Sequence, residues 1–324
     1  MPTRLIRKTA ILLKTETTYG TDAVPAGAAN AMLVSNLSIN PLNAKNVDRD
    51  NIRPYFGGSE QLVGVSYIEC GFDIELVGGG TAGTAPAWGA ALQACGFSEI
   101  ITLTTRVDYL PVSDALTSVT IYWYDDGVLH KLLGARGDVT FKMSSGDRPV
   151  MQFKFTGLDG GLAAAVSPTI ALAAFKTPQV VTDANTQDVT LGCTHLATGA
   201  PALVGGTVFP SLGLELMAGN SVSHTPLLGG ETVEITDRSV TGKLKLDLSA
   251  AQEVAAMGDV KAAALTSLGL VHGTVIGSRV LVFMPAVQRI NHTKEEMNGK
   301  RLIGYDLRIV PTLGNDELRI VTSF

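Results

Sequence analysis

The chain has 324 residues, 45% of them hydrophobic and 17% charged, and its formal net charge at pH 7 is −5. This composition excludes a disordered polypeptide, and the length allows two domains that each bury a core. The negative charge argues against tight nucleic-acid binding through counterion release, but a weakly acidic surface lets a polyanion slide past.

The first 30 residues predict an N-terminal arm, because residues 16–22 are polar and residues 24–27 show no hydrophobic period. The apolar run at residues 9–13 is too short for a signal peptide. No run approaches the ~20 apolar residues of a membrane span. We therefore expect a protein made in the cytoplasm, without a membrane partner.

Residues 33–39 predict a strand, and residues 40–56 predict a long polar loop. Loops of this length without structure of their own are uncommon in compact domains and are usually functional. The charged residues of this loop are Asp48, Arg49, Asp50 and Arg53. They indicate either a solvated loop or a contact between subunits, where arginine and carboxylate groups can pair through two hydrogen bonds.

Strict alternation over residues 63–77 predicts an antiparallel strand with one wet face. The apolar face carries Ile68, Cys70, Phe72, Ile74 and Leu76. The polar face carries Glu69, Asp73 and Glu75. These carboxylates either meet solvent or line a channel.

A short helix and two hairpins follow. The helix is expected over residues 86–96, and the hairpins over residues 118–133 and 139–155. Residues 161–205 are rich in Gly, Ala, Pro and Thr and predict a linker.

The second half of the chain repeats the first. Gly57 and Gly229 each open a Gly-Gly motif that precedes an alternating strand by 15 residues, and the strand positions Phe72 and Leu244 share the same 172-residue shift. The repeated strand is expected over residues 236–248. Its polar face carries Lys243, Lys245 and Asp247. Internal repeats of this kind indicate repeated structural units.

The repeat also predicts a second helix over residues 259–269 and a strand over residues 301–310. We therefore expect a mainly β chain with two tandem β-sandwich or barrel domains, each with a short flanking helix. The expected division is an arm at 1–30, a first domain at 31–160, a linker at 161–205 and a second domain at 206–324.

Few motifs suggest chemistry. Residues 78–83 fit G-x-G-x-x-G, but the strand before them has a charged face, whereas dinucleotide folds use parallel strands that are apolar on both faces. The three cysteines lack metal-ligand spacing and predict buried thiols. They are Cys70, Cys95 and Cys193. We expect no catalytic residue, no cofactor and no metal, and hence no enzyme.

Several short motifs together resemble the opening of major tail proteins of long-tailed bacteriophages. They lie at residues 15–22, 33–41, 46–50, 57–60, 86–89 and 95–97. The resemblance implies a tail tube protein of a non-contractile tail, made in the bacterial cytoplasm and incorporated into the virion. In that family a subunit packs two β-sheets with a flanking helix, and subunits join sheet edges into rings whose inner wall is a closed barrel. Rings stack through long loops and terminal arms into a DNA conduit around the tape measure protein, with tail terminator and distal tail proteins as further partners.

Family rings usually have sixfold symmetry and one tube domain per subunit. Two domains per chain therefore imply a ring of three chains with pseudo-sixfold symmetry, whose closure removes the open sheet edges. The expected lumen-facing residues are Glu69, Asp73, Glu75, Lys243, Lys245 and Asp247. The expected ring-to-ring contacts are Asp48, Arg49, Asp50 and Arg53. The alternatives are a monomeric two-domain β-sandwich binding module and a nucleotide enzyme built on residues 78–83.

Overall fold

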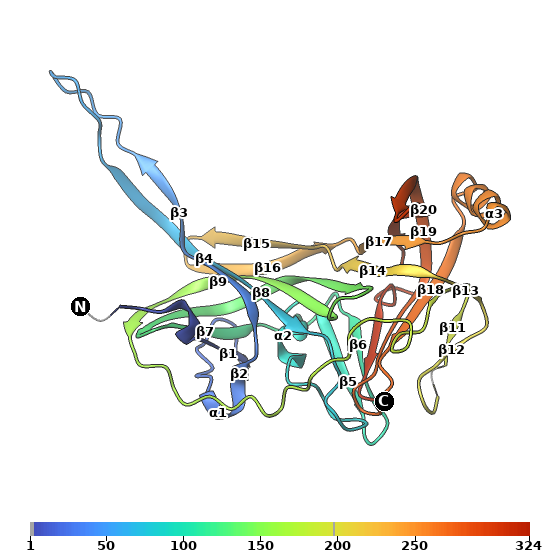
Figure 1. Ribbon diagram of the computed structural model, residues 1–324. Helices are drawn as coiled ribbons and strands as arrows, with labels where there is room; N and C mark the ends of the chain where they lie inside the picture. Colours follow the sequence, from blue (N-terminus) through green and yellow to red (C-terminus); the bar gives the residue numbers. More distant parts are fainter. Residues whose placement is uncertain (1–2, 197) are drawn as a thin grey trace.

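The computed structural model describes residues 3–196 and 198–324 and is mainly β, which confirms the expected fold class. Most strands belong to one antiparallel sheet system that runs the length of the molecule (Figure 1). A continuous hydrophobic core lies along it and includes residues from both halves of the chain, such as Phe72 and Leu244.

Four strands of the first half pair in the order β3-β4-β9-β8. Inward and outward side chains alternate along residues 136–143 of β8 and 150–158 of β9, so one face of this sheet packs into the core and the other stays partly exposed. On the core face, the rings of Phe153 and Phe155 stack at 5.7 Å. The elements are β3 (Ser35–Asp48), β4 (Gln61–Glu75), α2 (Gly89–Gln93), β8 (Val128–Ser144) and β9 (Val150–Ala164).

The second half repeats this arrangement in the order β14-β17-β20-β19. The chain again passes from the second strand through a helix to the long strand at the far edge and then back. The elements are β14 (Ser211–Met217), β17 (Thr241–Leu246), α3 (Ala250–Lys261), β19 (Val280–Met297) and β20 (Lys300–Ile309). Shared strand order supports the sequence repeat independently of residue spacing.

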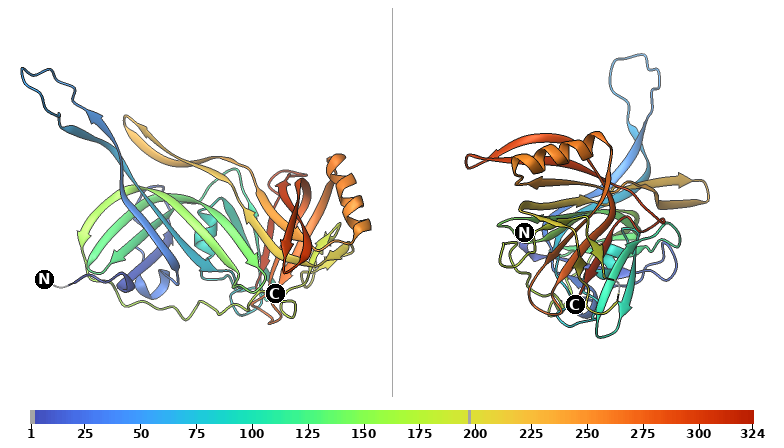
Figure 2. Two further views of the ribbon diagram at one scale, coloured as in Figure 1. Left: turned by 45° about the horizontal axis from the view of Figure 1, so that its top comes forward. Right: turned by 90° about the vertical axis from the view of Figure 1, so that its right-hand side faces the viewer.

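The two sheets meet edge to edge at β8 and β14, which pair antiparallel from Thr140↔Met217 to Ser144↔Gly213. We call this pairing the internal joint and the resulting eight-stranded sheet the wall. The wall is open within one chain (Figures 1 and 2). In the described part, β3 pairs only with β4, and residues 293–297 pair only with β20.

Shorter strands extend the sheet system around the core. In the first half, β7 pairs with β8 and β1, and β1 also pairs with β2. In the second half, β18 pairs with β19 and β10. β21 pairs with both β19 and β6 and so links the halves. The bounds are β1 (Thr9–Thr15), β2 (Ala31–Met32), β5 (Phe97–Thr102), β6 (Arg106–Pro111), β7 (Val119–Asp125), β10 (Val189–Leu191), β13 (Thr207–Phe209), β18 (Leu265–His272) and β21 (Arg319–Thr322). The remaining short elements are η1 (Ile6–Lys8), α1 (Gly27–Asn30), β11 (Thr194–His195) and β12 (Leu203–Val204).

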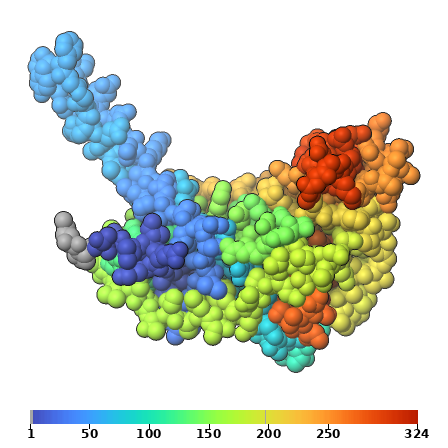
Figure 3. Space-filling view, viewed as in Figure 1, coloured from blue at the N-terminus to red at the C-terminus, as the bar shows by residue number. Residues whose placement is uncertain are grey.

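Each half also sends out a hairpin. The β3–β4 hairpin projects beyond the molecule, whereas the hairpin of β15 and β16 lies along the first half (Figures 1 and 3). From here on, the arm means the β3–β4 hairpin and not the N-terminal segment at residues 1–30. β15 and β16 contact β8 and β9. The bounds are β15 (Asn220–Leu227) and β16 (Gly230–Arg238). The hairpins therefore leave equivalent places in the two halves and differ in whether a neighbour supports them.

The arm corrects the expected loop at residues 40–56. β3 continues to Asp48, and only residues 49–60 connect it to β4. Polar side chains hid the strand, because both faces of the distal arm are exposed and no apolar alternation is required there.

Other expectations need similar correction. The N-terminal segment contains β1, whose residues Ile11 and Leu13 are buried beside β7. The helix predicted over residues 259–269 lies earlier, because Ser249 and Gln252 form a capping box and Ala263 ends the turn with φ 51°. The predicted strand over residues 236–248 is divided between β16 and β17.

Residues 165–188 form an irregular connection that ends at β10. His272 of β18 anchors it: His272 Nδ1 and Thr186 Oγ1 lie 2.8 Å apart, and His272 Nε2 lies 3.0 Å from the Gln179 carbonyl oxygen. Burial lowers the pKa of His272. The end of the connection is therefore packed against the second half, while Ala171 and Val181 hydrogen-bond to the first half.

Candidate assembly surfaces

The six residues expected to face a lumen lie along one face of the wall, opposite the core. Glu75 starts a row across paired strands that continues through Val150, Lys142, Glu215, Lys243 and Asp306. Directly paired residues share a face, so this row alternates in charge across the internal joint. The wall face is therefore mixed in charge, and the acidic side of β4 is one part of it.

Ion pairs join different strands on this face. Lys142 Nζ lies 3.6 Å from Glu215 Oε1 at the internal joint, and Lys245 Nζ lies 2.5 Å from Glu295 Oε2. Asp247, just after β17, pairs with Lys300 Nζ at 2.5 Å. Partners within the chain therefore balance several of these charges, which lowers the net field that the wall presents.

The carboxylates of β4 differ in their surroundings. Glu69 is exposed, whereas Asp73 is 7% exposed and accepts a hydrogen bond from Asn36 Nδ2 at 2.6 Å. Glu75 pairs with Arg148 at 2.9 Å. This pair ties the turn between β8 and β9 to the end of β4.

Asp138 fastens the internal joint where the second hairpin bends away from the wall. Its Oδ1 accepts a hydrogen bond from the backbone N–H of Asn220 at 3.0 Å, and Asn220 Nδ2 donates to the carbonyl oxygens of Cys95 and Gly137 at 2.7 and 3.0 Å. Burial raises the pKa of Asp138 despite these hydrogen bonds. Glycine is required at the other end of the joint, because Gly213 has φ 104° and a Cβ there would lie 1.9 Å from the Met143 carbonyl oxygen.

The charged residues of the arm gather near its tip. Arg49 and Arg53 both contact Glu60, the latter at 3.2 Å, and Asp48 Oδ1 accepts a hydrogen bond from Gln61 Nε2 at 2.6 Å. The contacts of Glu60 with these two arginines were not predicted from the sequence. Exposed apolar side chains surround the cluster: Ile52, Tyr55, Phe56, Leu62 and Val63. Monomeric soluble proteins rarely expose such groups together, so the arm has the character of an interaction surface.

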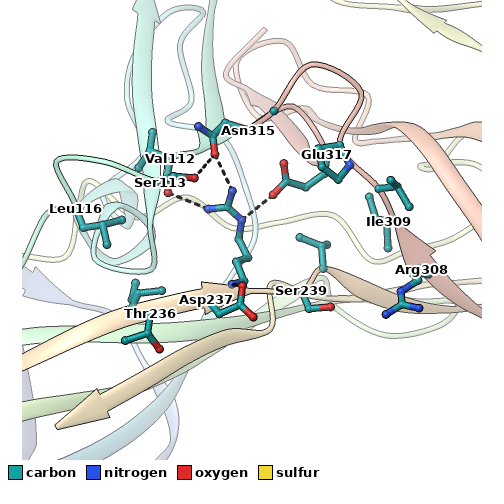
Figure 4. Close-up of a pocket in the computed structure, with 16 residues that line it drawn as sticks. Val112, Ser113, Leu116, Thr236, Asp237, Ser239, Arg308, Ile309, Asn315 and Glu317 are labelled. Atoms are coloured by element: carbon teal, nitrogen blue, oxygen red, sulfur yellow. Dashed lines mark hydrogen bonds and ion pairs between the residues drawn. The ribbon is translucent and has the colours of Figure 1, made fainter. Parts of the chain in front are cut away.

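A pocket of about 570 Å³ lies between the halves (Figure 4). At its centre Arg238 Nε donates to Glu317 Oε1 at 2.7 Å, and its other nitrogens donate to the Val112 carbonyl oxygen and Asn315 Oδ1 at 2.9 and 3.0 Å. Arg238 and Glu317 are 12% and 7% exposed. The guanidinium therefore binds Asn315 and Glu317 of the second half and the Val112 carbonyl oxygen of the first, so this site links the halves.

The glycine amides of the loop at residues 78–83 are already hydrogen-bonded within the chain. The N–H groups of Gly78 and Gly80 donate to the carbonyl oxygens of Ser278 and Gly277 at 3.2 and 2.8 Å, and that of Gly83 donates to Ser323 at 2.8 Å. A phosphate cradle needs such amides to point at the ligand. The loop instead ties β4 to the end of the chain.

The cysteines are free and buried, as predicted, and burial raises the pKa of the Cys70, Cys95 and Cys193 thiols. Among residues 3–196 and 198–324, no group of three metal-ligating side chains comes together.

The internal joint was not predicted from the sequence, although glycine at position 213 beside the alternating residues 214–217 was a visible signal. Its partner strand could not be read from spacing, since the paired residues of β8 and β14 are about 70 residues apart in the chain.

The helices within the described ranges all fall short of the length and apolar character needed to cross a membrane. A search of curated proteins finds no match to this sequence. A family model described as phage tail tube protein matches residues 6–308, nearly the whole chain. The open wall and the projecting arm thus occur in a chain that belongs to the phage tail tube protein family, a structural component of the phage tail.

Proposed function

We propose that three chains close into a pseudo-sixfold ring and that stacked rings form the DNA conduit of a long, non-contractile phage tail. The observation that carries this proposal is the open wall, which continues across two similar halves. Among the described residues, the outer edges of β3 and of residues 293–297 have no partner strand. Unpaired edges template pairing with another chain, and closure removes them. The expected domains at 31–160 and 206–324 each contribute four of the eight wall strands.

The size of the barrel supports three chains. Eight strands closed alone would leave an interior filled by side chains, whereas barrels of about 16 strands or more enclose an aqueous channel. Three walls would supply about 24 strands around a wide lumen. In this ring Glu69, Asp73, Glu75 and the lysines of β17 face the lumen. The mixed charges let DNA pass without tight binding.

The arm is the proposed contact between stacked rings. Its cluster of Asp48, Arg49, Asp50 and Arg53 supplies both signs of charge, and its apolar tip supplies area to bury. The tape measure protein would occupy the lumen before DNA passes, and tail terminator and distal tail proteins would cap the two ends. The chain would enter the virion tail after synthesis in the host cytoplasm.

Negative-stain electron microscopy of the concentrated protein, with light scattering, tests this proposal. We expect rings or tubes with a uniform lumen that persist at high salt, because edge pairing and apolar burial are screened little by ions. Monomers at every concentration would instead support the β-sandwich binding module. A variant with residues 49–60 replaced by a short glycine-containing turn should still form rings but lose stacking.

A further inference from the structure

The internal joint is a template for the contact between chains. We propose that the free edge of β3 pairs antiparallel with residues 293–296 of the next copy's β19, in the register that β14 shows with β8. This inference rests on the proposed ring and specifies which residues of neighbouring chains meet.

Strand order gives the first argument. β3 and β14 open the wall strands of their halves, and β8 and β19 close them. The internal joint connects the closing strand of the first half to the opening strand of the second. Repeating that connection leaves β19 to meet β3, the two strands whose outer edges are open.

The register follows from residue pairs within each half. Phe153 pairs with Phe72, and Tyr305 pairs with Leu244, so Phe153 and Tyr305 are equivalent. The residues just before them, Gln152 and Gly304, pair with Thr140 and Thr293. Thr140 of β8 therefore corresponds to Thr293 of β19. On the opening strands, core-facing Leu37 and Ile39 correspond to Leu214 and Leu216. The pairs between chains are therefore Leu37↔Glu296, Ser38↔Glu295, Ile39↔Lys294 and Asn40↔Thr293.

Burial gives the second argument. Leu214 and Leu216 are 2% and 0% exposed beside the internal joint, whereas Leu37 and Ile39 are only partly buried at the free edge. The helix beside the internal joint, α2, and the helix beside the free edge of β19, α3, differ in the same way. Ala91 and Leu92 of α2 are fully buried, but Val254 of α3 is 75% exposed. A second copy placed as at the internal joint would cover these apolar groups.

An unsatisfied amide gives the third argument. Asn220 follows Met217 by three residues, as Asn43 follows Asn40, and Asn220 Nδ2 donates across the internal joint. Asn43 Nδ2 is buried and donates to no acceptor within the described residues. Buried donors of this kind normally find partners, so a neighbouring chain would supply the acceptor.

One local difference limits the equivalence. Asn36 has a Cβ where Gly213 has none, and at Gly213 that atom would strike the opposing carbonyl oxygen. The proposed pairing therefore begins at Leu37. The positive φ of 52° at Asn36 keeps the bulge that precedes the edge in both halves.

Disulfide trapping tests the register. Directly opposed residues on antiparallel strands place Cα atoms about 4.5–5.5 Å apart, within the range of a disulfide. The full-length double variant S38C/E295C should, on mild oxidation, give covalent species of two and three chains on a non-reducing gel. Ser38 and Glu295 lie at opposite ends of the wall, so this disulfide must join different chains.

The controls use the same chemistry. K142C/E215C should form its disulfide within one chain, because these residues already oppose each other at the internal joint. S38C/E296C shifts the register by one residue and should not cross-link, since the thiols then lie on opposite faces. N40C/T293C is a second opposed pair for use if the first variant fails to fold.

The outcomes separate the joint from the ring. Wild-type rings whose variants S38C/E295C and N40C/T293C both fail to cross-link would overturn the proposed joint and leave the tube function standing. Wild-type protein that never assembles would overturn the function. Cross-linking of S38C/E296C instead would show a slipped register and also contradict the inference.

Discussion

The internal joint and the two free edges are the same structural position seen with and without a neighbour. At the joint, Leu214 and Leu216 are buried, and a glycine allows the backbones to approach. At the free edge of β3, Leu37 and Ile39 remain partly buried, although their strand has the same place in the sheet.

The burial of an apolar residue at a strand edge therefore depends on the fold and also on whether the neighbouring half belongs to the same chain. The second hairpin lies on β8 and β9, whereas the arm has only solvent around its distal half. Apolar side chains are exposed on the arm, at the β3 edge and on α3. The equivalent surfaces of β15–β16, β14 and α2 differ mainly in having a neighbouring half against them.

Removing the link between the halves should give the largest effect. Arg238→Ala leaves Glu317 buried without its cation, which costs about 3–5 kcal/mol of unfolding free energy. Urea denaturation measures it. The matched variant Arg49→Ala at the exposed arm should cost about 0–1 kcal/mol. Equal losses would mean that Glu317 does not remain a buried, unpaired charge in the variant.

The equivalent residues Leu216 and Ile39 test the comparison directly. Leu216→Ala should cost about 2–5 kcal/mol because it leaves a cavity in a closed core. Ile39→Ala should cost about 1 kcal/mol in the monomer, since its side chain is already partly solvated. Sedimentation should show Ile39→Ala weakening assembly more than its stability loss explains. Comparable monomer losses would contradict the idea that the β3 edge awaits a partner.

A smaller effect should appear with pH at the connection between the halves. The pKa of His272 is lowered by burial from its ordinary 6.5, so the unfolded chain binds a proton that the folded chain resists. Stability should be complete above about pH 6.5 and fall as pH drops through the folded pKa. Melting temperatures at pH 7.5 and 5.0 measure this, and His272→Gln should reduce the difference. An unchanged difference would assign the pH dependence to other groups.

The smallest effect belongs to the charged row of the wall. Lys142→Ala removes the ion pair with Glu215 and should cost about 0.2–1 kcal/mol at low salt. Added salt should shrink this loss, because the partners are partly exposed. A salt-independent loss would indicate that the aliphatic part of Lys142, and not its charge, stabilises the joint.

Much of the fold follows from local pattern. The period of two over β4 predicted its core and wet faces, and the turn at Asp126 and Gly127, both with positive φ, was readable from sequence. The repeat predicted a second unit similar to the first, and the structure adds that the wall strands of both halves share one order.

The errors came from places where tertiary context overrides pattern. The arm lacks a buried face, so its strands show no periodicity, and the second helix is set by the cap at Ser249 more than by its weakly apolar residues. The internal joint depends on the register between two strands, and neither strand alone encodes that register. The contacts of Glu60 likewise depend on how β3 and β4 are aligned.

The different directions of the two hairpins have a consequence for how rings would stack. The arm projects beyond the molecule (Figure 1), whereas the hairpin of β15 and β16 lies against β8 and β9. Around a ring of three chains, projecting and flat hairpins would alternate. Two such rings could then interlock at only half of the rotations that six identical subunits would permit, so each added ring would inherit its azimuth from the one below.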